Sequence, residues 1–206
     1  MRKLLFTSIS TIILLTATFR ISYGQTTTHA TETKKTSYAD YLDILAKVPE
    51  LFKNWLNATE SIADMQDKKK FAGIGRKISA ELTALQKIKI TLKANIDSGN
   101  IPTEGVWNYN INQIRGHIDQ INWLLKQTRS LTDKYSIDNA GTVINAFDIE
   151  FTGKVILFND IVAKSKKPGQ AGAVSVDLKK AIDILKAAQK HLDAFVAKLD
   201  PPPAHN

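Results

Sequence analysis

The stretch that decides the fold is residues 107–128, which read WNYNINQIRGHIDQINWLLKQT. Apolar side chains recur along it at alternating spacings of four and three residues. Residues three and four apart share one side of an α-helix, so the pattern predicts a helix with a single narrow apolar seam. Such seams are typical of helical bundles and coiled coils. The seam comprises Trp107, Ile111, Ile114, Ile118, Ile121, Leu125 and Thr128.

Two further segments show the same helical spacing. Residues 67–97 carry an apolar stripe and are followed by Gly99 and Pro102, which are typical signals for the end of a helix. The last helix is expected to have Ser175 as its N-cap and to end before Pro201. The stripes comprise Phe71, Ile74, Ile78, Leu82, Leu85, Ile88, Leu92 and Ile96 in the first segment, and Leu178, Ile182, Leu185, Leu192, Val196 and Leu199 in the last.

The first helical segment, residues 37–62, contains a proline inside its pattern. Pro49 has no backbone N–H and crowds the preceding turn, so a kink or a break is expected there.

Residues 144–162 fit two structures. Apolar residues at helical spacing favour a helix, as do the helical neighbours on both sides. Residues 147–151 nevertheless alternate between apolar and acidic side chains, and Gly153 follows them. That alternation also fits a β-hairpin, which stays open as the alternative.

Together these segments predict an all-α protein, an elongated up-and-down bundle of four or five long helices. The bundle is expected to form a single domain over residues 37–200. Residues 25–36 are polar and rich in threonine, and are predicted to be a disordered leader, while the three prolines in 201–206 predict an extended tail. The chain has no cysteine, which excludes disulfides and thiolate chemistry and leaves packing as its source of stability.

Residues 1–24 have the pattern of a cleaved signal peptide. Arg2 and Lys3 precede an uncharged apolar run, and small residues then lead to Gly24. The run is shorter than a membrane span and is interrupted by Arg20, which disfavours the alternative of a retained anchor. We therefore expect an exported chain, periplasmic or extracellular, with no transmembrane segment after cleavage.

The helical segment at 67–97 concentrates positive charge. It holds eight lysines and arginines against three acids, an excess of +5. The net charge of the whole chain, +8, would also fall to +5 once the three cations of the signal peptide are lost. A basic helix can contact an anionic polymer, an acidic protein or lipid headgroups, although an ordinary solvated face is the alternative. The candidate contacts are Lys69, Lys70, Arg76, Lys77 and Lys87.

A second candidate surface lies on the 107–128 helix, opposite its seam. The heptad spacing places Tyr109, Gly116 and Trp123 together there, among polar neighbours. Exposed aromatic residues often mark partner-binding surfaces. The alternative is that another helix of the same chain covers them.

No catalytic, metal or cofactor site is predicted. His117 and His191 are the only histidines outside the ends of the chain, and neither belongs to a ligand pattern for a metal ion. Gly73 and Gly75 lie within the 67–97 stripe, so we interpret them as thinning the helix for close packing rather than as a phosphate loop.

These observations favour an exported, non-enzymatic binding or scaffolding protein that acts through the basic helix and the aromatic face. Its partner would be an envelope protein or a second copy of the chain, with contact to an anionic polymer or lipid headgroup as an addition. The exported location disfavours nucleic acid. One alternative is a hydrolase acting on a cell-envelope polymer through converging carboxylates, and another is a periplasmic component of a secretion or transfer apparatus.

The signal-peptide prediction has a direct test. The protein recovered from the envelope fraction of its native host should begin at Gln25, as measured by N-terminal sequencing and intact mass. Recovery of the chain with Met1 in the membrane fraction would instead support the anchor.

Overall fold

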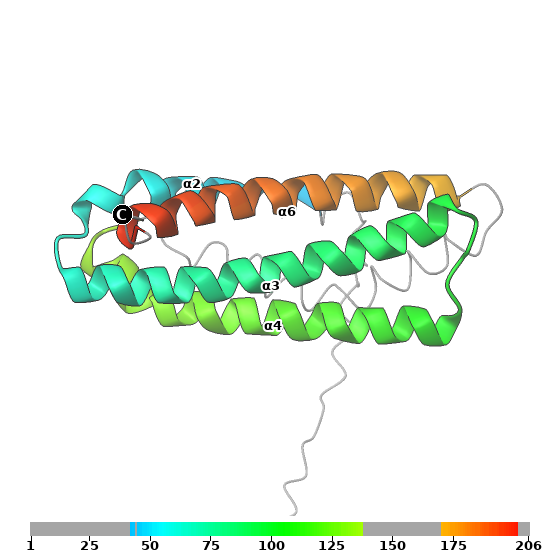
Figure 1. Ribbon diagram of the computed structural model, residues 1–206, viewed down its shortest axis with the longest axis horizontal. Coiled ribbons are helices and arrows are strands. Elements are labelled where there is room, and N and C mark those ends of the chain that lie inside the picture. The colour runs from blue at the N-terminus through cyan, green and yellow to red at the C-terminus, as the bar shows by residue number, and fades with distance from the viewer. Residues whose placement is uncertain (1–41, 44, 138–169, 202–206) are drawn as a thin grey trace, which may run out of the picture. The chain divides into compact units, whose positions relative to one another are not determined.

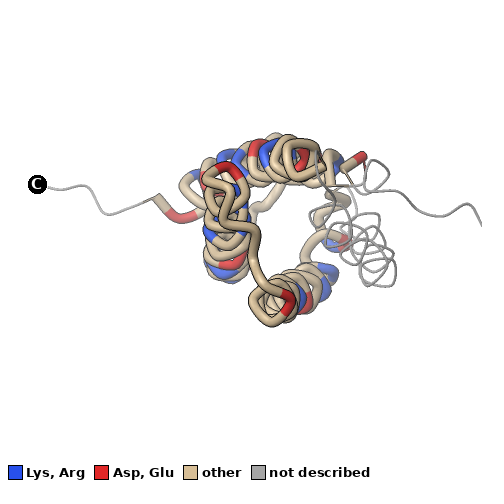
Figure 2. The backbone as a smooth tube through the Cα atoms, turned by 90° about the vertical axis from the view of Figure 1, so that its right-hand side faces the viewer, with Lys and Arg blue, Asp and Glu red and all other residues tan. Residues whose placement is uncertain are grey.

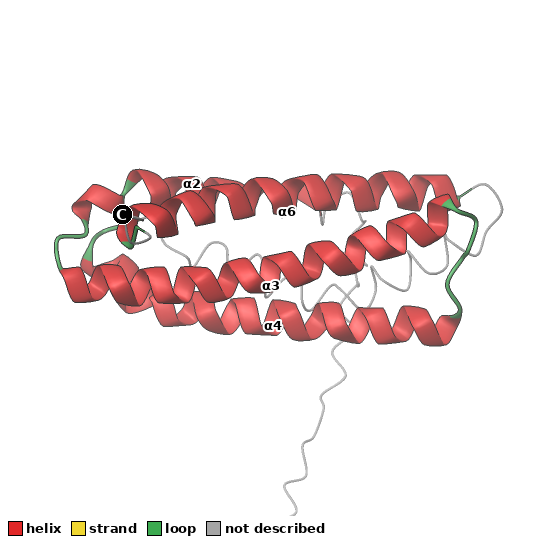
Figure 3. Ribbon diagram, viewed as in Figure 1, coloured by secondary structure: helices red, strands yellow, loops and turns green. Residues whose placement is uncertain are grey.

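A computed structural model describes residues 42, 43, 45–137 and 170–201 of this chain. These residues form helices and the short connections between them, without a strand (Figures 1 and 3). Four of the helices pack together, which confirms the all-α bundle for this part of the chain. The signal peptide, the leader, residues 144–162 with their hairpin alternative, and residues 202–206 of the tail lie outside the described residues. The elements are α2 (Lys47–Asn57), η1 (Thr59–Ser61), α3 (Met65–Asp97), α4 (Glu104–Lys134) and α6 (Ala171–Leu199).

Helix α3 is the element that the other long helices share. It packs against both α6 and α4, and α6 also packs against α2. Gly75 near the start of α3 lies against Val196 near the end of α6, whereas Asp97 at the end of α3 accepts a hydrogen bond from Ser175 near the start of α6. The two helices are therefore antiparallel, and α4 returns antiparallel to α3 after a short loop (Figure 1).

The interruption that we expected at Pro49 lies three residues earlier, at Ala46. Residues 42, 43 and 45 are helical, Ala46 forms a turn, and α2 then begins at Lys47. Pro49 therefore lies in the first turn of α2, where a backbone N–H has no acceptor within the helix.

The junction between α2 and α3 is held by a capping carboxylate. Asp64 accepts hydrogen bonds from the backbone N–H groups of Gln66 and Asp67, at 2.8 and 2.9 Å. Such a cap satisfies donors that the first turn of a helix leaves without partners, so α3 begins at Met65, two residues before the predicted start.

The prediction that Ser175 caps the last helix is wrong. Helix α6 begins four residues earlier, at Ala171, with Gln170 as its N-cap. Ser175 is buried inside the helix, and its hydroxyl donates to Asp97 of α3. A serine signals a cap only when its side chain turns back to its own backbone, and here the hydroxyl finds a partner on another helix.

Four aromatic side chains join three helices in the core. Phe52 and Trp55 of α2, Phe71 of α3 and Phe195 of α6 are fully buried. The ring centroids of Trp55 lie 4.9 Å from Phe71 and 5.6 Å from Phe195, and Phe71 meets Phe195 nearly edge to face at 4.9 Å. Aromatic pairs at such distances each stabilise a fold by about 0.5–1.5 kcal/mol beyond the area they bury.

Beside this cluster, polar side chains hold α3 and α6 in one register. Ser79 donates to Asp193 at 2.6 Å, and Gln86 donates to Gln189 at 2.6 Å. The amide of Gln189 in turn donates to Thr83 at 2.8 Å. Hydrogen bonds require defined distances and directions, so this network disfavours sliding of one helix along the other.

None of the described helices has the length and hydropathy that a bilayer span requires.

The two glycines of α3 have different roles. A Cβ atom at Gly75 would lie 2.6 Å from Cγ2 of Val196, so this glycine does permit the close packing that we predicted. A Cβ atom at Gly73 would meet nothing within 4 Å, so the packing interpretation is wrong for that residue.

This difference predicts opposite effects for two matched substitutions. Gly75→Ala should lower the free energy of unfolding by about 1–3 kcal/mol, because the added methyl group overpacks the contact with α6. Gly73→Ala should raise it by about 0.5–1 kcal/mol, because alanine favours a helix over glycine and has room at this position. Urea unfolding followed by circular dichroism measures both changes, and equal changes would contradict the assignment.

Candidate functional site

Two polar contacts clasp α3 to α4. At the first, Asp67 accepts hydrogen bonds from the ammonium group of Lys134 at 2.6 Å and from the hydroxyl group of Tyr135 at 2.7 Å. At the second, Nδ1 of His117 lies 2.6 Å from a carboxylate oxygen of Glu81. The two clasps are fourteen residues apart on α3, about 21 Å along its axis. The two clasps flank the intervening segment of α3 and fix its antiparallel register against α4.

The first clasp shifts the titration of its members. The hydrogen bond from Lys134, followed by that from Tyr135, holds the pKa of Asp67 below its ordinary value of 3.8, although partial burial opposes this. The same contact raises the pKa of Lys134 above 10.5. Both charges are thus favoured in the folded chain over the pH range between these values.

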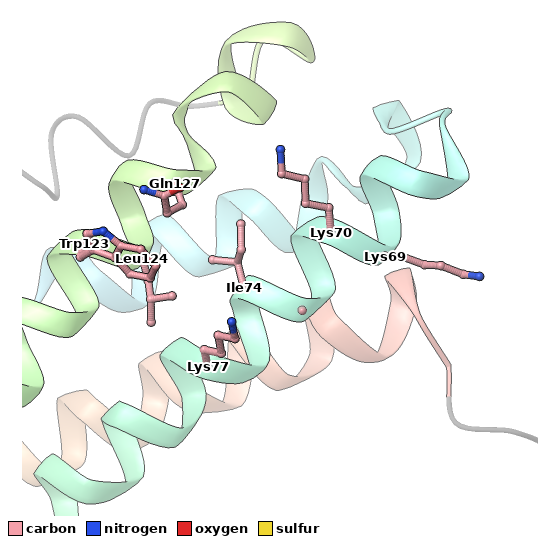
Figure 4. A pocket seen from close by; sticks show the side chains of 8 residues that line it. Lys69, Lys70, Ile74, Lys77, Trp123, Leu124 and Gln127 are labelled. Carbon is pink, nitrogen blue, oxygen red and sulfur yellow. The ribbon is translucent and has the colours of Figure 1, made fainter.

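A groove of about 320 Å³ lies between the clasps. Ile74 of α3 and Leu124 of α4 are partly and fully buried along it, and the exposed Trp123 stands at its edge (Figure 4). Gly73 also lines the groove, and the open space next to it is the space that a side chain there would occupy. The two clasps join α3 to α4 on either side of the groove, and Gly73 adds no side chain to fill it. Specific residues of this sequence therefore account for the groove.

Three lysines surround this apolar lining. Lys70 and Lys77 extend from the side of α3 that carries Ile74, whereas Lys69 points away from α4 (Figure 4). None of the three lysines lies within ion-pair distance of an acidic side chain of residues 42–137 and 170–201 for which the structure gives a position. Gln127 adds an amide from α4. Lys70 also interacts electrostatically with Asp67, although the two do not form an ion pair. The groove therefore presents positive charge beside a small apolar surface.

The other cations of α3 do not contribute equally to a basic face. Arg76 forms an ion pair with Asp200, and Lys93 forms one with Asp97. Lys89 is buried in the bundle, although we counted it as a surface charge. Figure 2 shows charges of both signs along the described helices. The accessible excess of α3 is therefore smaller than +5 and is concentrated at the groove.

The structure separates the predicted site residues into two groups. It brings Lys69, Lys70, Lys77 and Trp123 to one groove. It leaves Arg76 in its ion pair with Asp200, and it leaves Lys87 on the surface further along α3.

The predicted aromatic face extends beyond the groove. Tyr109 and Trp123 are 64% and 51% exposed, and a Cβ atom at Gly116 would meet nothing within 4 Å. Only Trp123 lines the groove, because Tyr109 lies fourteen residues earlier on α4, about 21 Å away along the helix. A binding role for Tyr109 and Gly116 stays a prediction.

Sequence reasoning missed Gly73, Ile74, Leu124 and Gln127 as parts of the site. Ile74 and Leu124 were expected in or beside apolar seams. The spacing of a seam does not show which of its side chains the neighbouring helix leaves accessible to a groove. One signal was present. Lys70, Gly73, Ile74 and Lys77 follow the three-and-four spacing that places residues on one side of a helix.

Among the described residues, the groove lining contains lysine, amide, indole and aliphatic groups and no carboxylate or histidine. Among the residues whose positions are described, no group of three or more His, Cys, Asp or Glu side chains has the geometry to hold a metal ion. Comparison with protein families, curated proteins and solved structures finds no match, so the geometry is the basis for interpreting the site.

The first clasp yields a pH-dependent prediction. Asp67→Asn removes a carboxylate whose pKa is lowered by folding, so the wild type should be more stable than the variant above pH 3.8. The difference should shrink as the pH falls below that value, because the wild-type carboxylate then becomes protonated. Urea midpoints between pH 2.5 and 7 measure the difference, with Asp119→Asn on the exposed face of α4 as the control. A difference that does not change with pH would contradict the assigned ion pair.

Proposed function

We propose that this chain is an exported, non-enzymatic binding protein and that the groove between α3 and α4 binds an anionic partner. The observation that carries the proposal is the placement of the exposed Lys70 and Lys77 beside Ile74, Leu124 and the exposed Trp123. Neither lysine forms an ion pair with an acidic side chain of the described residues. Export rests on the pattern of residues 1–24 and makes the cell envelope the expected source of the partner.

Each part of the groove supplies a different contribution to binding. The lysine charges attract an anionic partner at long range and raise its rate of association. The apolar lining and the indole of Trp123 gain free energy when a partner removes them from water. Tryptophan is also enriched among the residues that dominate binding energy at protein interfaces. Together these groups support binding of a partner that is both acidic and apolar.

Binding fits this site better than hydrolysis. A hydrolase with paired carboxylates needs one acid that holds its proton near neutral pH. Asp67 and Asp97 have pKa values shifted in the opposite direction, because each accepts hydrogen bonds from a lysine and a hydroxyl group. Neither lines the groove.

The same binding activity is compatible with the role of a component in a secretion or transfer apparatus.

A charge-matched capture experiment tests the proposal. Residues 25–206 would be immobilised and exposed to an envelope extract, and the retained proteins compared between two double variants. Lys70→Glu with Lys77→Glu reverses the charge at the groove, whereas Lys186→Glu with Lys190→Glu makes the same change at exposed positions outside it. The groove variant should lose a retained protein by at least about tenfold, while the control keeps it.

Salt provides the second measurement. Retention by the wild type should weaken as ionic strength rises, because the lysines are exposed and their charges are screened. Equal retention by the two double variants would contradict a binding role for the groove.

A further inference from the structure

We infer that the groove accepts an acidic amphipathic helix, which places two carboxylates on Lys70 and Lys77 and inserts one large apolar side chain between them. The inference rests on the proposed function and specifies the partner's chemistry. The partner is thus a protein segment with a defined spacing, rather than any polyanion.

The spacing follows from the positions of the lysines on α3. Lys70 and Lys77 are seven residues apart, about 10 Å along the helix axis, and Ile74 lies between them. A helix that lies along α3 presents acids at the same separation when they too are seven residues apart. An apolar residue three or four positions after the first acid then lies on the same side and meets Ile74.

The size of the recess limits what enters it. A volume of about 320 Å³ is near the lower end of about 300–1,000 Å³ for small-molecule sites. It therefore suits a single large side chain as the inserted group. Leu124, which is 1% exposed, and Trp123, which is 51% exposed, give this side chain one deep wall and one accessible wall. An amphipathic helix laid in a groove uses apolar anchors of this kind.

The other anionic partners match only part of the site. A polysaccharide or polyphosphate would satisfy the lysines but would place polar groups over Ile74 and Leu124, where burial without hydrogen bonds is unfavourable. A membrane surface would bring phosphates to the exposed lysines and Trp123 but would not fill a recess set between two helices. The combination of recess and charge thus favours a peptide.

Two synthetic peptides of identical composition test the inference. Both are alanine-rich helices that carry a fluorescent label, one leucine and two glutamates. In the matched peptide the glutamates occupy positions 8 and 15 and the leucine position 12. In the control peptide the glutamates are moved to the side opposite the leucine. Fluorescence anisotropy with residues 25–206 should show at least about tenfold tighter binding of the matched peptide.

Variants of the chain then locate the site. Gly73→Leu adds a large side chain at a lining position of the groove with open space around its Cβ, so it should reduce binding of the matched peptide by at least about tenfold without loss of helical content. Lys70→Gln with Lys77→Gln should reduce it similarly. Lys186→Gln with Lys190→Gln should leave it unchanged, because neither residue lines the groove.

The outcomes separate this inference from the proposed function. Equal binding of the two peptides, or binding that Gly73→Leu leaves unchanged, would overturn the inference. Failure of both peptides, with retention from the extract still dependent on Lys70 and Lys77, would overturn the inference and keep the proposed function. Binding to phosphatidylglycerol vesicles that displaces the matched peptide and is insensitive to Gly73→Leu would identify a lipid surface instead. If neither peptide nor extract shows dependence on these lysines, both proposals fail.

Discussion

The bundle depends on the close approach of α6 to α3 at Gly75. A side chain there would collide with Val196, so the bare backbone allows Phe71, Trp55 and Phe195 to meet in one cluster. A chain without cysteine has no covalent crosslink to maintain such contacts, and the helices are held by packing and by side-chain hydrogen bonds. This contact occupies one side of α3 and leaves the other side to α4.

Gly73 lies on that other side. Two residues along a helix correspond to a rotation of about 200°, so Gly73 and Gly75 face nearly opposite directions. Close packing fills the space at Gly75, whereas Gly73 lines the open groove between the clasps of Asp67 and Glu81. A glycine thus allows close helix packing on one side of α3 and lines an open groove on the other. The neighbouring helix determines which of the two occurs.

Periodicity was enough to predict the helices of the described part of the chain but not the groove. The seam of residues 107–128 is visible in the sequence because burial repeats with the helical turn. The same rule applies to polar residues: Lys89 lies four residues after Leu85 and three before Leu92, and it is buried as they are. We assigned it to the surface by residue type, and we assigned Ser175 to a cap for the same reason. Trp123 and Lys77 line one groove because of the register of α3 against α4, and that register depends on contacts between residues distant in sequence.

A lysine-rich helix does not by itself give binding selectivity for one partner. Exposed lysines are usually hydrated, and an isolated surface ion pair contributes little free energy. The groove adds an apolar recess between two of the lysines. In the proposed binding mode, a partner with the wrong spacing can pair its acids with the lysines or fill the recess, but it cannot do both. Selectivity then resides in the combination, since a mismatched partner leaves either a lysine without its anion or apolar surface in water. In the proposed binding mode Gly73 is as important as the charged residues, although it offers no group that binds.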